Sequence, residues 1–360
     1  MEPDRHILII GGGIFGLTAA ITLGEKGFKV TVLEKRSDVM QEASLVNQNR
    51  IHYGYHYPRS RATCEESLAG LESFREFYGE AINASFKKYY AIAKSGSNTT
   101  PKQFYDFFTS LNLPLEEALP DEGIVNKDLL DACWLTPEPI FDYNRLKQLV
   151  IYRLAKCKNV QLLRNATILA FKETNTSKEV TLTTGTKIHC DLIINATYAG
   201  LSDLLGKFNR EEINAKYQLC VMPILEMKNP PPPFGITIMD GPFCSLMPKG
   251  FEKGRFILYH VVHSVIQQHV GKKSIAWAPI NGMVEMEIME KARHYYPIIE
   301  HMKLVDTWIT TRIVLPEQEI DDARPTLLMN NGNNLYSIFS GKLTTCVEAA
   351  KQITDLVSGL

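Results

Sequence analysis

The feature that most constrains the fold is a glycine-rich turn near the start of the sequence, GGGIFG at residues 11–16. The apolar run before it, residues 6–10, predicts a short buried parallel strand. Residues 15–26 have a helical pattern that Gly27 ends, and residues 28–34 alternate β-branched and apolar side chains as a second strand does. The order strand, glycine turn, helix and strand is typical of a dinucleotide-binding unit.

Each glycine of the turn has a physical role in such a unit. Gly11 allows a tight turn, Gly13 lets the backbone approach a pyrophosphate, and Gly16 lets the helix pack closely on the strand. The helix N-terminus offers unpaired N–H groups and a partial positive charge to the phosphates. Glu34 ends the second strand, where a carboxylate accepts both ribose hydroxyls and disfavours NADP. The alternative, a glycine turn that only packs, leaves Glu34 unexplained.

The unit does not continue as regular alternating strands and helices, and this interruption favours FAD over NAD. After Glu34 the chain enters the segment SLVNQNRIHYGYHYP, and a strand typical of a nucleotide site returns only at residues 190–197. Four strand-like segments between residues 217 and 263, separated by proline and glycine turns, predict an antiparallel sheet.

The fold class predicted from this organisation is α/β, with an interrupted Rossmann-like FAD-binding domain and a second, mainly antiparallel β-sheet substrate domain. We assign residues 1–80, 142–205 and 320–360 to the FAD-binding domain, and residues 81–141 and 206–319 to the substrate domain. Helices are predicted between residues 62 and 90, at 142–157 with Asp142 as the N-cap, and at 284–296, 297–305 and 345–357. Further strands are predicted at 160–163, 166–173, 179–184 and 334–339.

Four motifs occur in the order seen in FAD-dependent oxidoreductases of the D-amino-acid oxidase (DAO) superfamily. They are the glycine turn with Glu34, the DYNRL start of the helix at residue 142, the CDLIINAT strand at 190–197, and the SGKLTT turn at 340–345. The chain resembles this superfamily, which includes glycine and sarcosine oxidases, L-2-hydroxyglutarate dehydrogenase and FAD-dependent glycerol-3-phosphate dehydrogenase. The resemblance covers roughly residues 1–60, 142–200 and 324–360, whereas residues 205–310 match only a general sheet pattern.

The stretch IHYGYHYPRS, residues 51–60, supplies the expected wall beside the flavin. If this stretch is extended, its period of two places His52, Gly54 and His56 on one face, and Gly54 permits close approach of the ring. The resemblance places His52 at the histidine beside the flavin in hydroxy-acid and glycerol-phosphate relatives. It places His56 where the glycerol-phosphate enzymes have an arginine, which counts against a phosphorylated substrate. Either histidine has the pKa to accept a substrate proton; covalent attachment of flavin to His52 is a less favoured alternative.

The turn SGKLTT resembles the glycine, lysine and paired threonine turn of glycerol-3-phosphate dehydrogenases. A helix N-terminus aimed at the flavin would stabilise the negative charge gained on reduction, Lys342 would reinforce it, and Gly341 would let the backbone approach the ring. The alternative is an ordinary Gly-Lys pair at a helix start. We expect further cofactor contacts from residues that flank these turns, namely Ile14, Phe15, Lys35, Ala196, Leu343 and Thr344.

Two arginines are candidates for binding a substrate anion. Arg324 is similar to the arginine of an arginine-proline element that positions the substrate in relatives, and a guanidinium makes two parallel hydrogen bonds to a carboxylate. A surface salt bridge of Arg324 to Asp321 or Asp322 is the alternative. Arg50 is the second candidate for anion binding and is also expected among the residues that bind the cofactor. His260 and His263, on a predicted strand at odd spacing, are expected to face opposite ways and are weaker candidates.

The composition limits the classes of partner, metal site and location that we expect for this chain. A formal net charge of -1 gives no electrostatic footprint for nucleic acid. The seven cysteines are scattered, which argues against a disulfide framework or a zinc site, so we expect no metal and a cytoplasmic location. The apolar run at residues 6–24 is interrupted by clustered glycines, unlike a membrane span.

The predicted function is an FAD-dependent oxidoreductase, a dehydrogenase or oxidase, that oxidises a small anionic hydroxy or amino substrate by hydride transfer to flavin N5. His52 and His56 line the site, Arg324 orients the substrate, and Lys342 stabilises reduced flavin. The sequence leaves open whether oxygen or a quinone reoxidises the cofactor, and it gives no oligomeric state. One alternative is an amine or amino-acid oxidase of the same fold; another, from a different class, is a non-redox flavin-binding protein such as a mutase or sensor.

Overall fold

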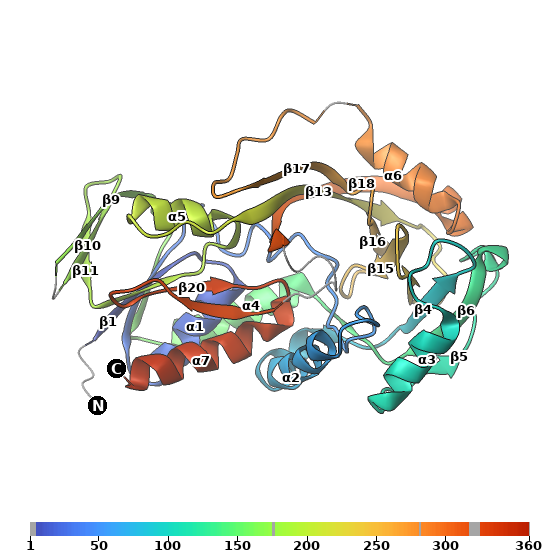
Figure 1. The fold of residues 1–360 in the computed structure, drawn as a ribbon, viewed down its shortest axis with the longest axis horizontal. Coiled ribbons are helices and arrows are strands. Elements are labelled where there is room, and N and C mark those ends of the chain that lie inside the picture. The colour runs from blue at the N-terminus through green and yellow to red at the C-terminus, as the bar shows by residue number, and fades with distance from the viewer. Residues whose placement is uncertain (1–4, 175–176, 281, 317–324, 360) are drawn as a thin grey trace.

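A computed structural model describes residues 5–174, 177–280, 282–316 and 325–359. Two large sheets dominate it, a six-stranded one near the chain termini and a nine-stranded one, and helices pack against both (Figure 1). Both parallel and antiparallel strand pairs occur, so the predicted α/β class is confirmed. The division into two domains at particular residues stays a prediction.

The six-stranded sheet has the order β19, β20, β12, β1, β2, β8, and all of its neighbouring strands are parallel except β19 and β20. Its strands come from separated parts of the chain, so the unit is interrupted as predicted. The strands are β1 (His6–Ile10), β2 (Lys29–Leu33), β8 (Val160–Leu163), β12 (Leu192–Asn195), β19 (Leu327–Asn330) and β20 (Leu335–Phe339).

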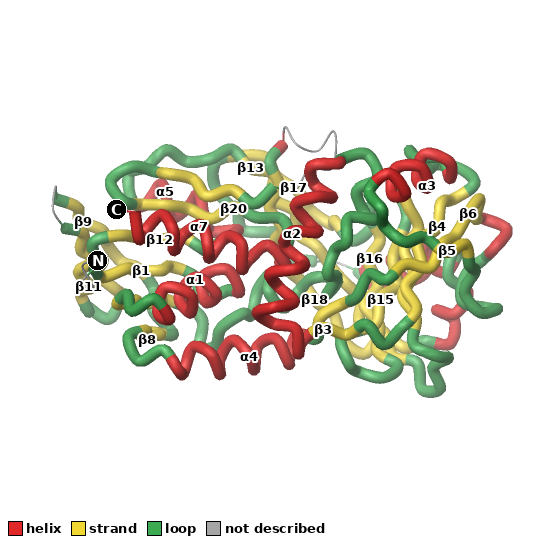
Figure 2. Tube along the Cα trace, turned by 90° about the horizontal axis from the view of Figure 1, so that it is seen from below, coloured by secondary structure: helices red, strands yellow, loops and turns green. Residues whose placement is uncertain are grey.

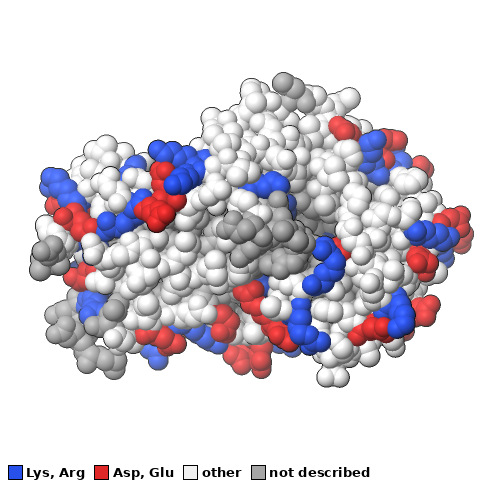
Figure 3. Space-filling model, in the orientation of Figure 1, with Lys and Arg blue, Asp and Glu red and all other residues white. Residues whose placement is uncertain are grey.

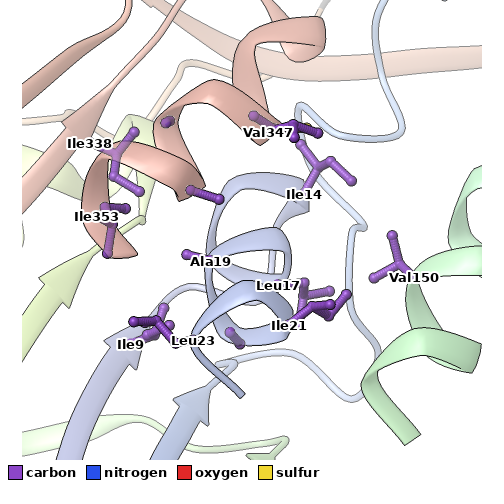
Figure 4. Close-up of a cluster of buried hydrophobic side chains, with 14 of the residues drawn as sticks. Ile9, Ile14, Leu17, Ala19, Ile21, Leu23, Val150, Ile338, Val347 and Ile353 are labelled. Atoms are coloured by element: carbon purple, nitrogen blue, oxygen red, sulfur yellow. The ribbon is translucent and has the colours of Figure 1, made fainter. Parts of the chain in front are cut away.

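Helices α1 (Ile14–Glu25), α4 (Tyr143–Lys156) and α7 (Cys346–Gly359) cover one face of this sheet, as Figure 2 shows from below. α1 is apolar on nearly all sides because it lies between the sheet and the other two helices. In Figure 4, Ile9 of the sheet, Leu17 of α1, Val150 of α4 and Ile353 of α7 point into this shared core. Burial of these side chains holds the first turn of α1 in place.

The other face of the six-stranded sheet packs on a three-stranded sheet, on α5 (Leu201–Lys207) and on the start of β13. The three strands are β9 (Ile168–Glu173), β10 (Lys178–Leu182) and β11 (Lys187–Cys190). Layers on both faces explain why β1 and β12 are almost uniformly apolar.

The nine-stranded sheet is antiparallel except where β14 runs parallel to β4. Helix α6 (Val284–Arg293) packs on it, and α3 (Pro101–Ser110) covers its other end near β4. Its strands are β4 (Lys87–Ala93), β5 (Glu116–Glu117), β6 (Leu130–Thr136), β13 (Ala215–Glu226), β14 (Phe234–Met239), β15 (Cys244–Pro248), β16 (Arg255–His260), β17 (Val265–Gly271) and β18 (Lys303–Val314). Two short strands, β3 (Ile82–Asn83) and β7 (Ile140–Phe141), pair with each other as a separate antiparallel sheet.

Two predicted helices are wrong in part. The helix expected between residues 62 and 90 is α2 (Arg61–Tyr78), and the chain after it forms β3 and β4 because those segments find strand partners far along the sequence. Residues 297–305 contain only a short 3₁₀ helix, Pro297–His301, before β18 begins. β18 pairs along its whole length with β13, and this long-range pairing overrides the local helical pattern.

Charged side chains of both signs are interspersed on the face drawn in Figure 3, over β9–β11 and α5 at one end and over α3 and β6 at the other. The upper middle of this face, above β17, carries few charges. Among the described residues, no helix combines the length and the apolar character that crossing a bilayer requires.

Candidate active site

A cavity of about 820 Å³ lies where the carboxyl end of the six-stranded sheet meets the nine-stranded sheet. The first turn of α1, the end of β12 and the turn after β20 line one side of it. The opposite side consists of residues from β13, β14, β16 and β18, and the loop that contains both candidate histidines completes the wall. Clefts beyond the carboxyl ends of parallel strands are where α/β folds bind ligands.

The glycine turn has the tight geometry that the sequence predicts. Gly11 has a φ of +116°, and a Cβ on it would lie 2.5 Å from the carbonyl oxygen of Ala196 at the end of β12. A Cβ on Gly16 would lie 2.1 Å from the carbonyl oxygen of Gly11. Around Gly13, by contrast, a Cβ would meet only the Ser44 hydroxyl, at 3.3 Å. The turn is therefore closed against the protein and open toward the cavity.

The N-terminus of α1 faces this opening. Gly13 is its N-cap and provides no side-chain acceptor, and the first turn contains no acidic residue. Ile14 donates its backbone N–H to the Ser44 hydroxyl at 3.0 Å, and Ile14 and Phe15 both line the cavity. A helix start of this kind presents a partial positive charge to an anion.

Glu34 follows β2 directly and lies beside the same turn. Its carboxylate accepts hydrogen bonds from the backbone N–H of Gly12 at 2.9 Å and of Arg36 at 2.8 Å. Lys35 next to it is exposed. A dinucleotide such as FAD fits these features, because the glycine cradle leaves no room for a side chain and the acidic group lies one strand away from the helix start.

The histidine loop is not the extended strand that the period of two assumes. Gly54 has a φ of +102°, and two successive turns follow, from Gly54 to Tyr57 and from Tyr57 to Ser60. A Cβ on Gly54 would lie 2.0 Å from the Cys64 sulfur, so packing on α2 requires this glycine. The turns nevertheless bring the rings of His52 and His56 to a centroid distance of 5.8 Å, and both line the cavity.

His52 contacts a buried polar cluster behind the cavity wall. Its Nδ1 lies 3.9 Å from Oε2 of Glu138, a carboxyl that is buried between β6 and β7. The Tyr90 hydroxyl donates to Oε1 of Glu138 at 2.5 Å. Burial, together with the positive charges of Arg50, Lys342 and Lys88, holds the pKa of His52 well below its usual value. His52 is therefore a neutral imidazole at neutral pH.

Lys88 is the buried cation of this cluster. Its ammonium donates to the Thr237 hydroxyl at 2.5 Å and lies 4.3 Å from the centre of the Tyr90 ring. Burial and the neighbouring Arg50 hold the pKa of Lys88 well below its usual value. Burial also raises the pKa of Glu138, although Lys88 and Arg50 oppose that shift.

Four cationic side chains line the cavity, and only two of them have an acidic partner among the described residues. Arg59 is paired with Asp240 at 2.7 Å, and Asp240 also accepts from the Thr99 hydroxyl at 2.9 Å. The Lys342 ammonium lies 2.5 Å from Glu66 of α2. Arg50 and Arg312 are the two that lack such a partner in the described ranges.

Arg50 and Arg312 are held by neutral groups instead. Arg50 Nη1 lies 3.0 Å from Nδ1 of His56, while its Nε and Nη2 are buried with no hydrogen-bond partner in the part of the chain that the structure describes. Arg312, on β18, donates through Nε and Nη2 to the amide oxygen of Gln218 on β13, at 3.0 and 2.6 Å. Among the described residues, the cavity wall therefore carries more positive than negative side chains.

Lys342 has a different environment from the one the sequence suggests. Its ammonium points to α2, where it also donates to the backbone oxygen of Thr63 at 3.3 Å and to the Ser67 hydroxyl at 3.4 Å. Burial lowers its pKa, and the Glu66 carboxylate opposes that shift. A direct role of Lys342 at the flavin thus stays a prediction, and its charge is balanced by Glu66.

Some of the remaining predicted residues line the same cavity. Ala196, Gly341 and Leu343 line it, whereas Thr344 is buried beside it with a hydroxyl that has no hydrogen-bond partner among the described residues. Arg324 lies outside the described residues. His260 and His263 do not face opposite ways: the chain turns after β16, and their rings lie 4.6 Å apart.

Sequence reasoning missed Arg59, Glu138 and Arg312. Arg312 belongs to a strand that was not predicted, although the alternation in TWITTRIV is a strand signal. Glu138 stands between two prolines, Pro137 and Pro139, a pattern that fixes the backbone and could have indicated a rigidly held side chain.

The comparisons with known proteins agree with this geometry. The family model for FAD dependent oxidoreductases, DAO, matches residues 6–356. The FAD-dependent monooxygenase FPY4 of Fusarium mangiferae is 25% identical over 362 residues, which cover 97% of this chain and 90% of that protein. L-proline dehydrogenase from P. horikoshii has a TM-score of 0.78 at 16% identity, covering 99% of this chain and 94% of that one. Glycine oxidase from Geobacillus kaustophilus has a TM-score of 0.76 at 16% identity, covering 99% and 95%.

Proposed function

The chain belongs to the DAO family of FAD-dependent oxidoreductases, as the resemblance predicted, and within this family we propose that it oxidises a small organic anion at a carbon bearing a hydroxyl or an amine. FAD, when bound, supplies the two-electron oxidation. The glycine turn, the start of α1 and Glu34 would hold its nucleotide part, and the residues from Ser340 to Leu343 would line the rest. The chain's own side chains must bind and orient the substrate and accept its proton.

The charge balance of the cavity is the observation that carries the proposal. Arg50 and Arg312 have no acidic partner among the described residues, and both line the cavity that the glycine turn opens into. A buried or half-buried guanidinium without a counter-ion is costly, and a bound anion removes that cost. Arg312 is the better placed to bind directly, because Gln218 holds one edge of its planar group and the side chain is not fully buried.

A proton acceptor is available on the same wall. His52 is a neutral imidazole, so a ring nitrogen can accept the proton that a hydroxyl or an ammonium group loses on oxidation. His56 accepts a hydrogen bond at Nδ1 from Arg50, which fixes its ring beside that of His52. We assign proton acceptance to His52 and positioning of the Arg50 guanidinium to His56.

An amino acid and a 2-hydroxy acid both satisfy these requirements. The two solved structures named above are a glycine oxidase and an L-proline dehydrogenase, which supports testing amino acids first. The fungal relative is named a monooxygenase, which supports a second candidate in which an oxygen atom enters the product. Oxygen as the electron acceptor serves either chemistry.

Anaerobic mixing of the FAD-loaded protein with panels of amino acids, 2-hydroxy acids and polyol phosphates tests the proposal. Bleaching of the visible flavin band by a member of the first two panels is the expected result. Bleaching by polyol phosphates alone would contradict the substrate class, and no bleaching by any panel would favour a non-redox flavin protein. Admission of ¹⁸O-labelled oxygen after bleaching then separates an oxidase, which releases peroxide, from a monooxygenase, which labels the product.

A further inference from the structure

A carboxyl with no solvent exposure lies directly behind His52. Glu138 is between β6 and β7, flanked by Pro137 and Pro139, and both of its oxygens have defined contacts. Oε1 accepts from the Tyr90 hydroxyl at 2.5 Å, and Oε2 accepts from the backbone N–H of Tyr53 at 3.1 Å. Oε2 also lies 3.9 Å from Nδ1 of His52, which is too long for a hydrogen bond and becomes an ion pair when His52 is protonated.

The backbone fixes the spacing between these two side chains. Ile51 donates its N–H to the carbonyl oxygen of Pro139 at 3.1 Å, and Phe141 donates to the carbonyl oxygen of Asn49 at 2.8 Å. These bonds join the residues just before His52 to those just after Glu138, and they form a bridge between Arg50 and Ile140. Backbone hydrogen bonds therefore hold the histidine loop against the glutamate segment.

The charges around His52 show why an acidic neighbour such as Glu138 would stabilise the protonated ring. The positive charges of Arg50, Lys88 and Lys342 lower the pKa of the ring, and the rings of His56 and Tyr57 lie beside it. A proton added to His52 would meet this positive field. Glu138 is the one carboxylate that an ion-pair contact joins to the ring within the described residues, and Nδ1 is its ring nitrogen that is buried with no hydrogen-bond partner there.

We propose that Glu138 is the positioning residue of His52: it holds the Nδ1–H tautomer, presents Nε2 to the substrate, and balances the imidazolium that forms. The inference rests on the proposed role of His52 as proton acceptor. As the substrate C–H bond is oxidised by the bound cofactor, its O–H or N–H bond breaks. The proton moves to Nε2, a new N–H bond forms there, and the product gains a C=O or C=N bond. Glu138 keeps its own protonation state throughout, because its charge compensates that of the ring.

Glu138→Gln in the FAD-loaded enzyme tests this role, since it keeps the volume and removes the charge. We expect the rate of anaerobic flavin reduction to fall by about 100-fold or more, with cofactor content and substrate affinity little changed. Glu138→Asp should recover part of the rate. Glu173→Gln is the matched control, because the Glu173 carboxylate is 16% exposed and ion-paired as well, but with Lys178 and Arg210, away from the cavity. The flavin of that control variant should be reduced at the wild-type rate.

A spectroscopic readout separates this role from simple packing. In the resting holoenzyme labelled with ¹⁵N-histidine, with His52 assigned by its loss in His52→Gln, wild type should show Nδ1 protonated and Nε2 unprotonated. Glu138→Gln should shift that tautomer balance. If Glu138→Gln does not retain FAD, the same spectrum is recorded for Glu138→Asp and Tyr90→Phe. Both variants disturb the carboxylate while keeping its charge, so both should shift the tautomer balance of His52.

The outcomes distinguish the two proposals. A His52→Gln enzyme that is reduced at the wild-type rate removes His52 as the proton acceptor and overturns both. A slow His52→Gln combined with an unchanged Glu138→Gln, or a wild-type spectrum with Nε2 protonated, overturns only the role of Glu138.

Discussion

Gly11 and Ala196 lie so close that a Cβ on the glycine would be 2.5 Å from the alanine carbonyl oxygen. The contact joins the end of β1 to the end of β12, two strands that are paired in the same sheet although paired residues, such as Leu8 and Ile193, are 185 positions apart in the sequence. It fixes the position of the turn from which α1 starts. We therefore expect cofactor binding to depend on this close approach.

The first prediction concerns this contact. Gly11→Ala should abolish FAD binding and lower the unfolding free energy by more than the roughly 1–2 kcal/mol of a left-handed backbone, because the new methyl group also clashes with Ala196. Gly332→Ala is the control: Gly332 has a φ of +83° with nothing near its Cβ position, so only the backbone cost applies. FAD titration and thermal unfolding of both variants check the difference; equal losses would show that the close approach is unimportant.

Arg312 provides the second prediction. Arg312→Met should raise the substrate Kd by about 10- to 100-fold, the range expected for losing hydrogen bonds to a charged group, while FAD stays bound. Rapid anaerobic mixing over a range of substrate concentrations gives this Kd separately from the reduction rate. Lys102→Met on the exposed surface of α3 serves as the control for a lost cation. A Kd that does not change in Arg312→Met would place the anion elsewhere, with Arg50 the next candidate.

Lys342 and Glu66 are expected to behave as a coupled pair. The Lys342 side chain has no exposure, so Glu66→Gln leaves a buried ammonium without its counter-charge and should cost roughly 3 kcal/mol of unfolding free energy or somewhat less, because Glu66 is partly exposed. Lys342→Met combined with Glu66→Gln should recover much of that loss. Denaturant unfolding of the two single variants and the double variant measures the coupling, and strict additivity would argue against the pair.

The pH dependence of stability follows from the lowered pKa of His52. In the unfolded chain His52 binds a proton below its usual value of 6.5, whereas in the folded protein it stays neutral until well below that value. The unfolded state thus binds more protons between the two values, so this group makes stability fall as the pH falls through 6.5.

His52→Gln should remove this contribution. The unfolding free energy of wild type minus that of the variant should decrease on acidification below pH 6.5, by at most about 1.4 kcal/mol per pH unit. Urea unfolding of both proteins at a series of pH values measures the difference. A difference that is constant across this range would mean that His52 titrates normally in the folded protein.

Much of the six-stranded sheet and the helices on it could be predicted because the sequence signals there are local. The strand at residues 6–10 was predicted with its observed bounds, and the Asp142 cap and the turn before α7 were placed correctly. Glycine positions and helix caps depend on backbone geometry within a few residues, so a single sequence reveals them.

The nine-stranded sheet depends on long-range pairing and was predicted less well. β18 was missed because its partner β13 lies about 90 residues earlier, as the pairing of Gln218 with Arg312 shows, and Arg312 was missed with it. The histidine loop was predicted as extended, yet packing of Gly54 against Cys64 bends it into turns. His52 and His56 were still correctly grouped, because they are close in sequence and the turns keep their rings together.

Recognition of an anion at the place where the substrate is oxidised is the central proposal for this protein. Anaerobic reduction of the FAD-loaded enzyme by its best carboxylic acid substrate, compared with the amide of the same acid, tests this directly, since the two differ only in charge at the group that the arginines bind. We predict that the acid reduces the flavin at least about 100-fold more efficiently than the amide. Equal efficiencies would contradict the proposed role of the arginines and the substrate class with it.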